Sequence, residues 1–196
     1  AKRLQETVKT RKALEEKEMV LSEEVVRDYR LEGDAWYSNY QFKNALMAYE
    51  KAMNYVSRGQ SPQRWASILT DIGKTHWKIG IRVKGMAIEK HLNAAVKTYE
   101  QALEVYIREE LPQDWAGTQN NLGIVLQNQG IRTGGMEGVQ LLAEAVAAYR
   151  KALEVRTREE LPQDWAMTQN NLAQAYLYLE DWQGSKACYS QVLKVN

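Results

Sequence analysis

The chain has 196 residues, and its 26 Lys and Arg residues nearly balance its 25 Asp and Glu residues, leaving a formal charge of +1. Nucleic-acid binders cluster an excess of Lys and Arg, so this balance argues against phosphate-backbone binding as the main function. A single Cys excludes an internal disulfide, and the lack of a long apolar run predicts no membrane span. The single Cys also predicts a cytoplasmic protein. The chain begins Ala-Lys-Arg-Leu-Gln, without an initiator Met or a signal-peptide pattern, so we expect it to be part of a larger multidomain protein.

Residues 1–22 are predicted to form a charged amphipathic helix. Apolar residues from Leu4 to Leu21 recur among many Lys and Glu residues. Ser22, with Glu23 and Glu24 after it, is expected to cap the helix that follows. The first helix would cap the repeats described below or continue upstream; a self-associating coiled coil is the alternative.

Residues 23–60 contain the first predicted helix pair. Ala45, Tyr49 and Ala52 stand four and three residues apart, which places them on one face of a helix. The same pattern recurs 50 and 100 residues later, around Tyr99 and Tyr149. Small alanines let a neighbouring helix approach closely, and the tyrosine fills the space beside them.

Three prolines mark the units that follow, about 61–110, 111–160 and 161–196. Pro62, Pro112 and Pro162 are 50 residues apart, and the segment from Arg108 to Ala116 recurs unchanged 50 residues later. Proline suits the first position of a helix, so each proline is predicted to begin one. The tryptophan three residues after each proline is expected to pack in the core between repeats; these are Trp65, Trp115 and Trp165. Self-similarity at a fixed period indicates a repeat array.

In these residues the chain resembles the tetratricopeptide (TPR) repeat, over roughly residues 23 to 196. The family places Leu-Gly and an aromatic residue on its first helix, and Ala, an aromatic residue and Ala on its second. The matching residues include Gly33, Trp36, Ile72-Gly73, Leu122-Gly123, Leu172-Ala173, Tyr176, Trp182 and Tyr189, with Ser185 and Val192 replacing the last two alanines. The resemblance implies an all-α fold, a right-handed α-solenoid of about four helix pairs plus the N-terminal helix.

The Leu-Pro-Gln-Asp-Trp-Ala segments resemble the long-repeat TPR subtype of cyanobacterial and other bacterial multidomain proteins. In that subtype the arrays often stand beside caspase-like (CHAT) peptidase or signalling modules. Relative to the standard repeat, the chain carries about ten extra residues at Ile81–Lys90 and again at Ile131–Gln140. Four glycines at the second insert favour a loop there, whereas the first could be partly helical. A longer connector is the favoured interpretation of both inserts, and a dedicated binding loop is the alternative.

Residues with catalytic potential do not assemble into a recognisable site. Gly73-Lys74-Thr75 ends a phosphate-loop motif, but Ile68 stands where that motif needs Gly, and the segment aligns with a helix. His76 and His91 have no companion at a metal-ligand spacing, and Cys188 is expected to be a buried small hydrophobe. We therefore expect no enzyme activity, no cofactor and no metal.

A partner is expected in the concave groove that stacked TPR pairs form, since the resemblance implies that the first helix of each pair lines it. Two Asn residues at equivalent positions, Asn120 and Asn170, could form a ladder along an extended ligand, with Asn121 and Asn171 structural. Cations at Arg27, Arg30, Lys74 and Lys78 would prefer an acidic segment or a C-terminal carboxylate. The predicted partner-binding residues are Arg27, Arg30, Asp34, Tyr37, Thr70, Lys74, Trp77, Lys78, Asn120, Ile124, Gln127, Asn170, Gln174 and Tyr178.

The sequence predicts a scaffold that binds a protein or peptide, and no nucleic-acid or membrane partner is expected. Two alternatives remain at this point. One is an oligomerisation or spacer module that self-associates through its terminal helices, because the end of the chain, Val192–Asn196, lacks a polar capping helix. The other is a sensor array that regulates an attached effector such as a caspase-like peptidase.

Overall fold

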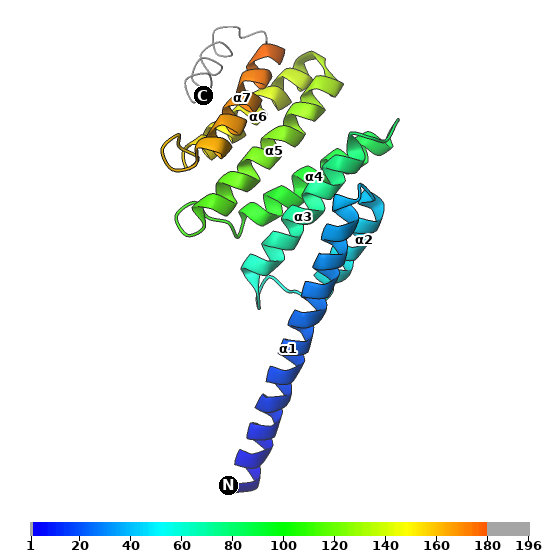
Figure 1. Cartoon of the computed structure of the whole chain (residues 1–196), viewed down its shortest axis with the longest axis vertical. Coiled ribbons are helices and arrows are strands. Elements are labelled where there is room, and N and C mark those ends of the chain that lie inside the picture. The colour runs from blue at the N-terminus through cyan, green and yellow to red at the C-terminus, as the bar shows by residue number, and fades with distance from the viewer. Residues whose placement is uncertain (1, 180–196) are drawn as a thin grey trace. The chain divides into compact units, whose positions relative to one another are not determined.

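The computed structural model describes the backbone of residues 2–179 and the side chains of residues 11–13 and 19–179. Every regular element in this range is an α-helix (Figure 1). The helices are α1 (Lys2–Ser38), α2 (Phe42–Met53), α3 (Pro62–Gly80), α4 (Ala87–Leu103), α5 (Pro112–Thr133), α6 (Gly135–Leu153) and α7 (Pro162–Tyr178). The predicted all-α class is confirmed. The chain divides into two compact units between Ile68 and Leu69, inside α3, and each unit is described by itself.

Helix α1 runs without a break through the predicted boundary at residue 22. The prediction that Ser22 caps a new helix is therefore wrong. Ser22 lies inside α1, and its hydroxyl donates to the carbonyl oxygen of Tyr55 at 3.1 Å. The predicted apolar positions Leu4, Val8 and Leu14 lie outside the described side chains.

In the first unit, α2 packs against the C-terminal half of α1. Ala45, Tyr49 and Ala52 are buried, as their spacing predicts. Gly33 on α1 makes room for the Tyr49 ring, because a Cβ at Gly33 would lie 2.4 Å from Tyr49 Cε1. The Tyr49 hydroxyl donates to Asp34 Oδ1 at 2.6 Å and joins the two helices a second time.

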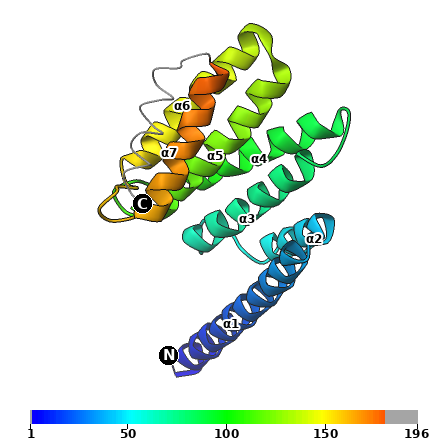
Figure 2. The same cartoon turned by 45° about the horizontal axis from the view of Figure 1, so that its top comes forward.

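In the second unit, α5 packs between α4 and α6, and α7 packs against α6 (Figure 2). The repeated tyrosines Tyr99 and Tyr149 are fully buried together with their flanking alanines. Tyr99 shares a cluster with Leu92 and Val125. Tyr149 belongs to a second cluster with residues of α7 such as Leu172. The predicted Ala-Tyr-Ala core face is therefore confirmed in all three described repeats.

The prolines begin helices as predicted. Pro62, Pro112 and Pro162 are the first residues of α3, α5 and α7. The tryptophans that follow are not equivalent, which corrects the prediction of a shared core role. Trp165 is buried, with 8% of its surface exposed. Trp65 and Trp115 are partly exposed. An arginine lies over each of the three rings, Arg58, Arg108 and Arg158 at 5.7, 6.0 and 6.0 Å, so the difference lies in burial alone.

The second insert is not the predicted loop. Helix α5 extends to Thr133 and α6 begins at Gly135, so Gly134, with φ 64°, is the whole connection. Gly130 and Gly138 let the two helices touch, because a Cβ on Gly138 would lie 2.5 Å from the Gly130 carbonyl oxygen. Glycine serves close backbone approach at these two positions, which is why composition alone indicated a loop. The first insert holds the longer connection, between Gly80 and Ala87.

Candidate functional site

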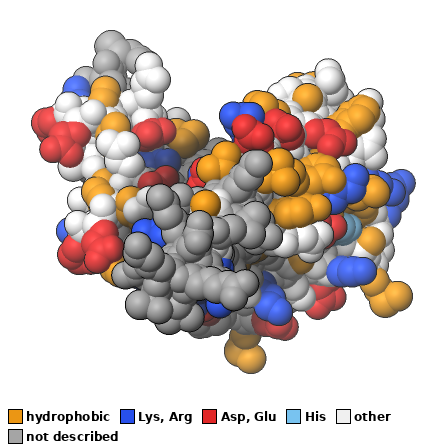
Figure 3. Space-filling view, turned by 90° about the horizontal axis from the view of Figure 1, so that it is seen from below, with side chains coloured by type: hydrophobic (Ala, Val, Ile, Leu, Met, Phe, Trp, Pro, Cys, Tyr) orange, Lys and Arg blue, Asp and Glu red, His pale blue; other side chains and the backbone are white. Residues whose placement is uncertain are grey.

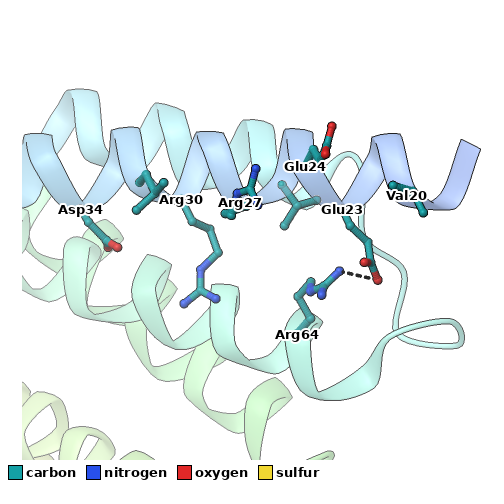
Figure 4. Close-up of a pocket in the computed structure, with 9 residues that line it drawn as sticks. Val20, Glu23, Glu24, Arg27, Arg30, Asp34 and Arg64 are labelled. Carbon is teal, nitrogen blue, oxygen red and sulfur yellow. Dashed lines mark ion pairs between the residues drawn. The ribbon is translucent and has the colours of Figure 1, made fainter. Parts of the chain in front are cut away.

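An open cavity of about 570 Å³ lies between α1 and the first turn of α3 in the first unit (Figure 4). We call it the α1 cavity. Its apolar lining comes from Val20, Val26 and Leu31, and its charged lining consists of Glu23, Glu24, Arg27, Arg30, Asp34 and Arg64. Three of the predicted partner-binding residues, Arg27, Arg30 and Asp34, therefore line one cavity.

The two most enclosed cations of this cavity are Arg30 and Arg64. The Arg30 side chain extends from α1 toward α3, and its Nη2 donates to Ser67 Oγ at 3.0 Å (Figure 4). Arg64 projects from α3 toward α1 and pairs with Glu23, with 3.1 Å between Nη1 and Oε1. Arg27 is exposed and pairs with its exposed neighbour Asp28, at 3.7 Å. Arg30 and Arg64 are thus held by contacts across two helices, whereas Arg27 stands at the rim.

Two other predicted residues of the first unit take part in the fold. Asp34 accepts the hydrogen bond from the Tyr49 hydroxyl, so one of its oxygens is already used. Tyr37 is partly buried, and its ring meets the ring of Phe42 edge-on at 5.1 Å. Asp34 and Tyr37 are therefore engaged within the first unit.

A second cavity of about 610 Å³ shares Glu23, Val26 and Arg64 with the α1 cavity. It is lined on its other side by Met19 and by the segment from Tyr55 to Ser61 that joins α2 to α3. The Glu23–Arg64 ion pair therefore belongs to the walls of both cavities.

In the second unit, the predicted residues on α3 are mostly engaged with their own helix. Lys74 Nζ lies 3.6 Å from Asp71 Oδ1, and Thr70 is partly buried. Lys78 Nζ lies 4.2 Å from the centre of the Trp77 ring. Burial, and then the nearby Arg82 charge, lower the pKa of Lys78. The Trp77 indole packs against the cluster around Tyr99, and its buried Nε1 has no hydrogen-bond partner.

The predicted asparagine ladder is not exposed. Asn120 has 1% of its surface exposed and accepts a hydrogen bond from Asn171 Nδ2 at 3.2 Å, which joins α5 to α7. Gln127 is also buried and accepts from the Tyr149 hydroxyl at 2.9 Å. Only Asn170 of the proposed ladder remains partly exposed. The roles of Asn120 and Gln127 are therefore corrected from ligand contacts to contacts within the array.

The remaining predicted residues lie on the outer parts of α5 and α7. Ile124 is partly buried, whereas Gln174 and Tyr178 are exposed. All three belong to the second unit, and we treat them as a surface of that unit alone.

His76 and His91, which the sequence left as unrelated residues, meet between α3 and α4. Their Nδ1 atoms are 2.8 Å apart and their ring centres 5.1 Å apart. Burial, the His91 imidazole and the Lys90 charge together lower the pKa of His76 to about 4. Among the described residues, no group of three or more His, Cys, Asp or Glu side chains could hold a metal. Cys188 lies outside the described residues.

The Gly73-Lys74-Thr75 segment lies within α3 and takes part in helix packing, not in a phosphate-binding loop. A Cβ on Gly73 would lie 2.8 Å from the Tyr99 ring, and the Thr75 hydroxyl donates to the Asp71 carbonyl oxygen at 2.7 Å. The backbone N–H groups here belong to α3, so they are not available to cradle a phosphate.

Comparison with known proteins identifies a repeat in the last part of the chain. Residues 165–196 match the family model of a tetratricopeptide repeat. No curated protein matches the sequence. The solved structures that match include BtubC (BKLC) from P. vanneervenii, which is 17% identical, with a TM-score of 0.41 over 92% of this chain and 90% of that one.

The family match supports a TPR-type repeat, and with it a protein-interaction scaffold in general terms. Folds of this type are typically non-catalytic. The match does not separate the long-repeat subtype from other TPR proteins, so that subtype stays a prediction. In the residues that the structure describes, no helix is long and apolar enough to cross a membrane.

Proposed function

We propose that this chain is a protein-interaction module that binds a peptide segment in the α1 cavity through one carboxylate and adjacent apolar side chains. The observation that carries the proposal is the position of Arg30, whose guanidinium extends from α1 into the cavity that Val20 and Leu31 also line. The carboxylate would belong to an acidic side chain or to the C-terminus of the partner.

Arg30 suits this role because a guanidinium binds a carboxylate through two parallel N–H donors. Arg30 is partly buried, so an ion pair at this position would be less screened than one at the surface. Arg64 lines the same cavity and is held by Glu23. A ligand carboxylate would compete with Glu23 for Arg64, so Arg30 is the preferred cation for the ligand.

The lining also limits which ligands fit. The lining contains three arginines and the three carboxylates Glu23, Glu24 and Asp34, so the cavity carries no large excess of positive charge. A long acidic run would meet repulsion from the glutamates. A segment with one carboxylate and an apolar neighbour fits better, since Val20 and Leu31 are 53% and 59% exposed and offer apolar contact.

Peptide binding measured by fluorescence anisotropy tests the proposal. Peptides with free C-terminal carboxylates are compared with their amidated forms and with forms carrying internal Glu residues, using the parent chain, Arg30→Met and the control Lys43→Met. Lys43 is exposed on α2 of the same unit and does not line the cavity. Loss of a charge-assisted hydrogen bond at Arg30 should weaken binding by about tenfold or more. Equal affinities for Arg30→Met and Lys43→Met would exclude the cavity as the binding site.

One observation favours self-association as a second function. Met19, Val20 and Leu21 are consecutive on α1 and are 59%, 53% and 63% exposed. Light scattering over a range of concentrations tests it. A parent chain whose mass rises to that of a dimer with concentration, together with a Met19→Ser/Leu21→Ser variant that stays monomeric, would support self-association through α1. A concentration-independent monomer would count against it.

A further inference from the structure

Two methionines in the second unit are exposed almost completely. Met86 has 90% of its surface exposed and Met136 has 92%. They are 50 residues apart, the distance that separates equivalent positions of successive repeats. Single exposed apolar residues are ordinary on protein surfaces. The same residue type at the same repeat position, with nearly full exposure in both, is a feature that packing of the array does not require.

The backbone presents both methionines in the same way. Each follows a glycine in the left-handed region, Gly85 with φ 66° and Gly135 with φ 58°. A Cβ on either glycine would meet no atom within 4 Å, so both glycines border open space. Each methionine stands at the start of a second helix, Met86 just before α4 and Met136 in the first turn of α6.

The two turns lie at the same end of the second unit. Helices α4 and α6 both pack against α5, and they run in the same direction (Figures 1 and 2). Met86 and Met136 therefore project from one edge of a single compact unit. Figure 3 shows that hydrophobic side chains can project singly beyond the charged surface of this molecule. Side chains that project from an edge can insert into a flat surface. A partner helix would instead need a groove on this unit to bind in.

The surroundings of the two methionines are apolar and basic. Val139 and Ile131, near Met136, are 54% and 40% exposed. The two inserts together contain four cations, Arg82, Lys84, Lys90 and Arg132, and two carboxylates, Glu89 and Glu137. All six charged side chains are exposed. This excess of positive charge complements an anionic surface.

We propose that this edge, which we call the methionine edge and define by Met86, Met136 and the basic residues of the two inserts, docks on the surface of an anionic lipid bilayer. The methionines would enter the interface between headgroups and acyl chains, while Lys84 and Lys90 would lie at the level of the anionic headgroups. Contact of this kind needs no membrane-spanning helix. The proposal is independent of the peptide site at the α1 cavity, which lies in the other unit.

Vesicle flotation tests the proposal. The probes are vesicles of phosphatidylcholine alone and vesicles in which about a third of the lipid is phosphatidylserine. The variants are Met86→Ser/Met136→Ser and Lys84→Glu/Lys90→Glu, with Met47→Ser as the control. Met47 is 57% exposed on α2 and does not belong to the methionine edge. All substituted side chains are exposed, so melting curves should match those of the parent.

The parent chain should float with the anionic vesicles and much less with the neutral ones, and added salt should release it. Each double variant should lose binding by about tenfold or more, whereas Met47→Ser should bind like the parent. Failure of the parent to float with anionic vesicles at low salt would overturn the proposal and leave a protein surface as the remaining explanation of the edge. Equal flotation of Met86→Ser/Met136→Ser and the parent would overturn it as well.

Discussion

Gly123 on α5 lies directly against the ring of Tyr149 on α6. A Cβ on Gly123 would stand 2.6 Å from Tyr149 Cε1, well inside van der Waals contact. The same relationship joins Gly33 to Tyr49 and Gly73 to Tyr99, so one glycine–tyrosine contact closes each described helix pair. The first-helix glycines and the Ala-Tyr-Ala face of the second helices are the two halves of this contact.

Gly123→Ala should destabilise the chain by about 1–3 kcal/mol, because the added methyl forces the buried Tyr149 ring or the backbone to move. Gly117→Ala is the matched control on the same helix. The nearest atom to a Cβ at Gly117 is Arg156 Nη2, at 3.6 Å, so alanine fits there and should stabilise the helix by about 0.5–1 kcal/mol. Urea denaturation of both variants measures the difference, and equal midpoints would contradict the proposed contact.

Asn171→Ala should cost about 1–3 kcal/mol, because it removes the donor to the buried Asn120 Oδ1 and leaves that oxygen without the bond that joins α7 to α5. Asn170→Ala removes a partly exposed neighbour and should change the free energy of unfolding by less than about 0.5 kcal/mol. Thermal denaturation followed by circular dichroism compares the two. A larger loss in Asn170→Ala would argue against the assignment of the inter-repeat bond.

Trp165→Ala should destabilise the chain more than Trp115→Ala, although the two residues occupy equivalent positions. Trp165 is buried, and truncating a buried tryptophan costs about 3–5 kcal/mol. Trp115 is partly exposed, so its truncation leaves a smaller cavity. Urea midpoints of the two variants decide the order, and identical losses would mean that both rings are equally buried.

The stability of the chain should fall as the pH drops from about 6.5 toward about 4, because His76 has its pKa lowered to about 4 in the folded chain from an ordinary value of 6.5. In this window the unfolded chain binds the proton more strongly than the folded chain, so protonation favours unfolding. The shift comes from burial first, and then from His91 and Lys90. His76→Gln removes the titrating group and should flatten this part of the pH profile of the urea midpoint. A profile with the same slope in parent and variant would contradict the lowered pKa.

The sequence predicted the helix pairs because their signals are local. Proline at the first helical position and the periodic alanines around Tyr49, Tyr99 and Tyr149 depend only on helix geometry, and the structure confirms both. The glycines of the second insert were ambiguous between a loop and a helix contact. Gly130 and Gly138 let α5 and α6 touch, whereas Gly134 connects the two helices. The pattern that favours glycine in a loop also favours it where two helices touch.

The candidate site was predicted only in part, because it depends on contacts between distant residues. Arg27, Arg30 and Asp34 were found from their repeat positions, but Arg64 and Glu23 were missed, since their ion pair joins residues 41 positions apart along the chain. One feature of the sequence distinguishes Arg64 as a candidate: it stands where the later repeats have Asp114 and Asp164. Asn120 was misassigned because its partner, Asn171, lies in the next repeat. The contact between His76 and His91 was not predicted for the same reason, because it joins residues of two different helices.

Site-specific photo-crosslinking tests the central claim, that the α1 cavity receives a peptide carboxylate, most directly. Benzoylphenylalanine is placed at Leu31, which lines the cavity, and separately at Met47, which is exposed on α2 outside it. With the tightest-binding carboxylate peptide, the Leu31 position should give a crosslink that the amidated peptide and Arg30→Met both reduce, and the Met47 position should give none. Crosslinking from Met47 but not from Leu31, or crosslinking from Leu31 that neither change reduces, would contradict the claim.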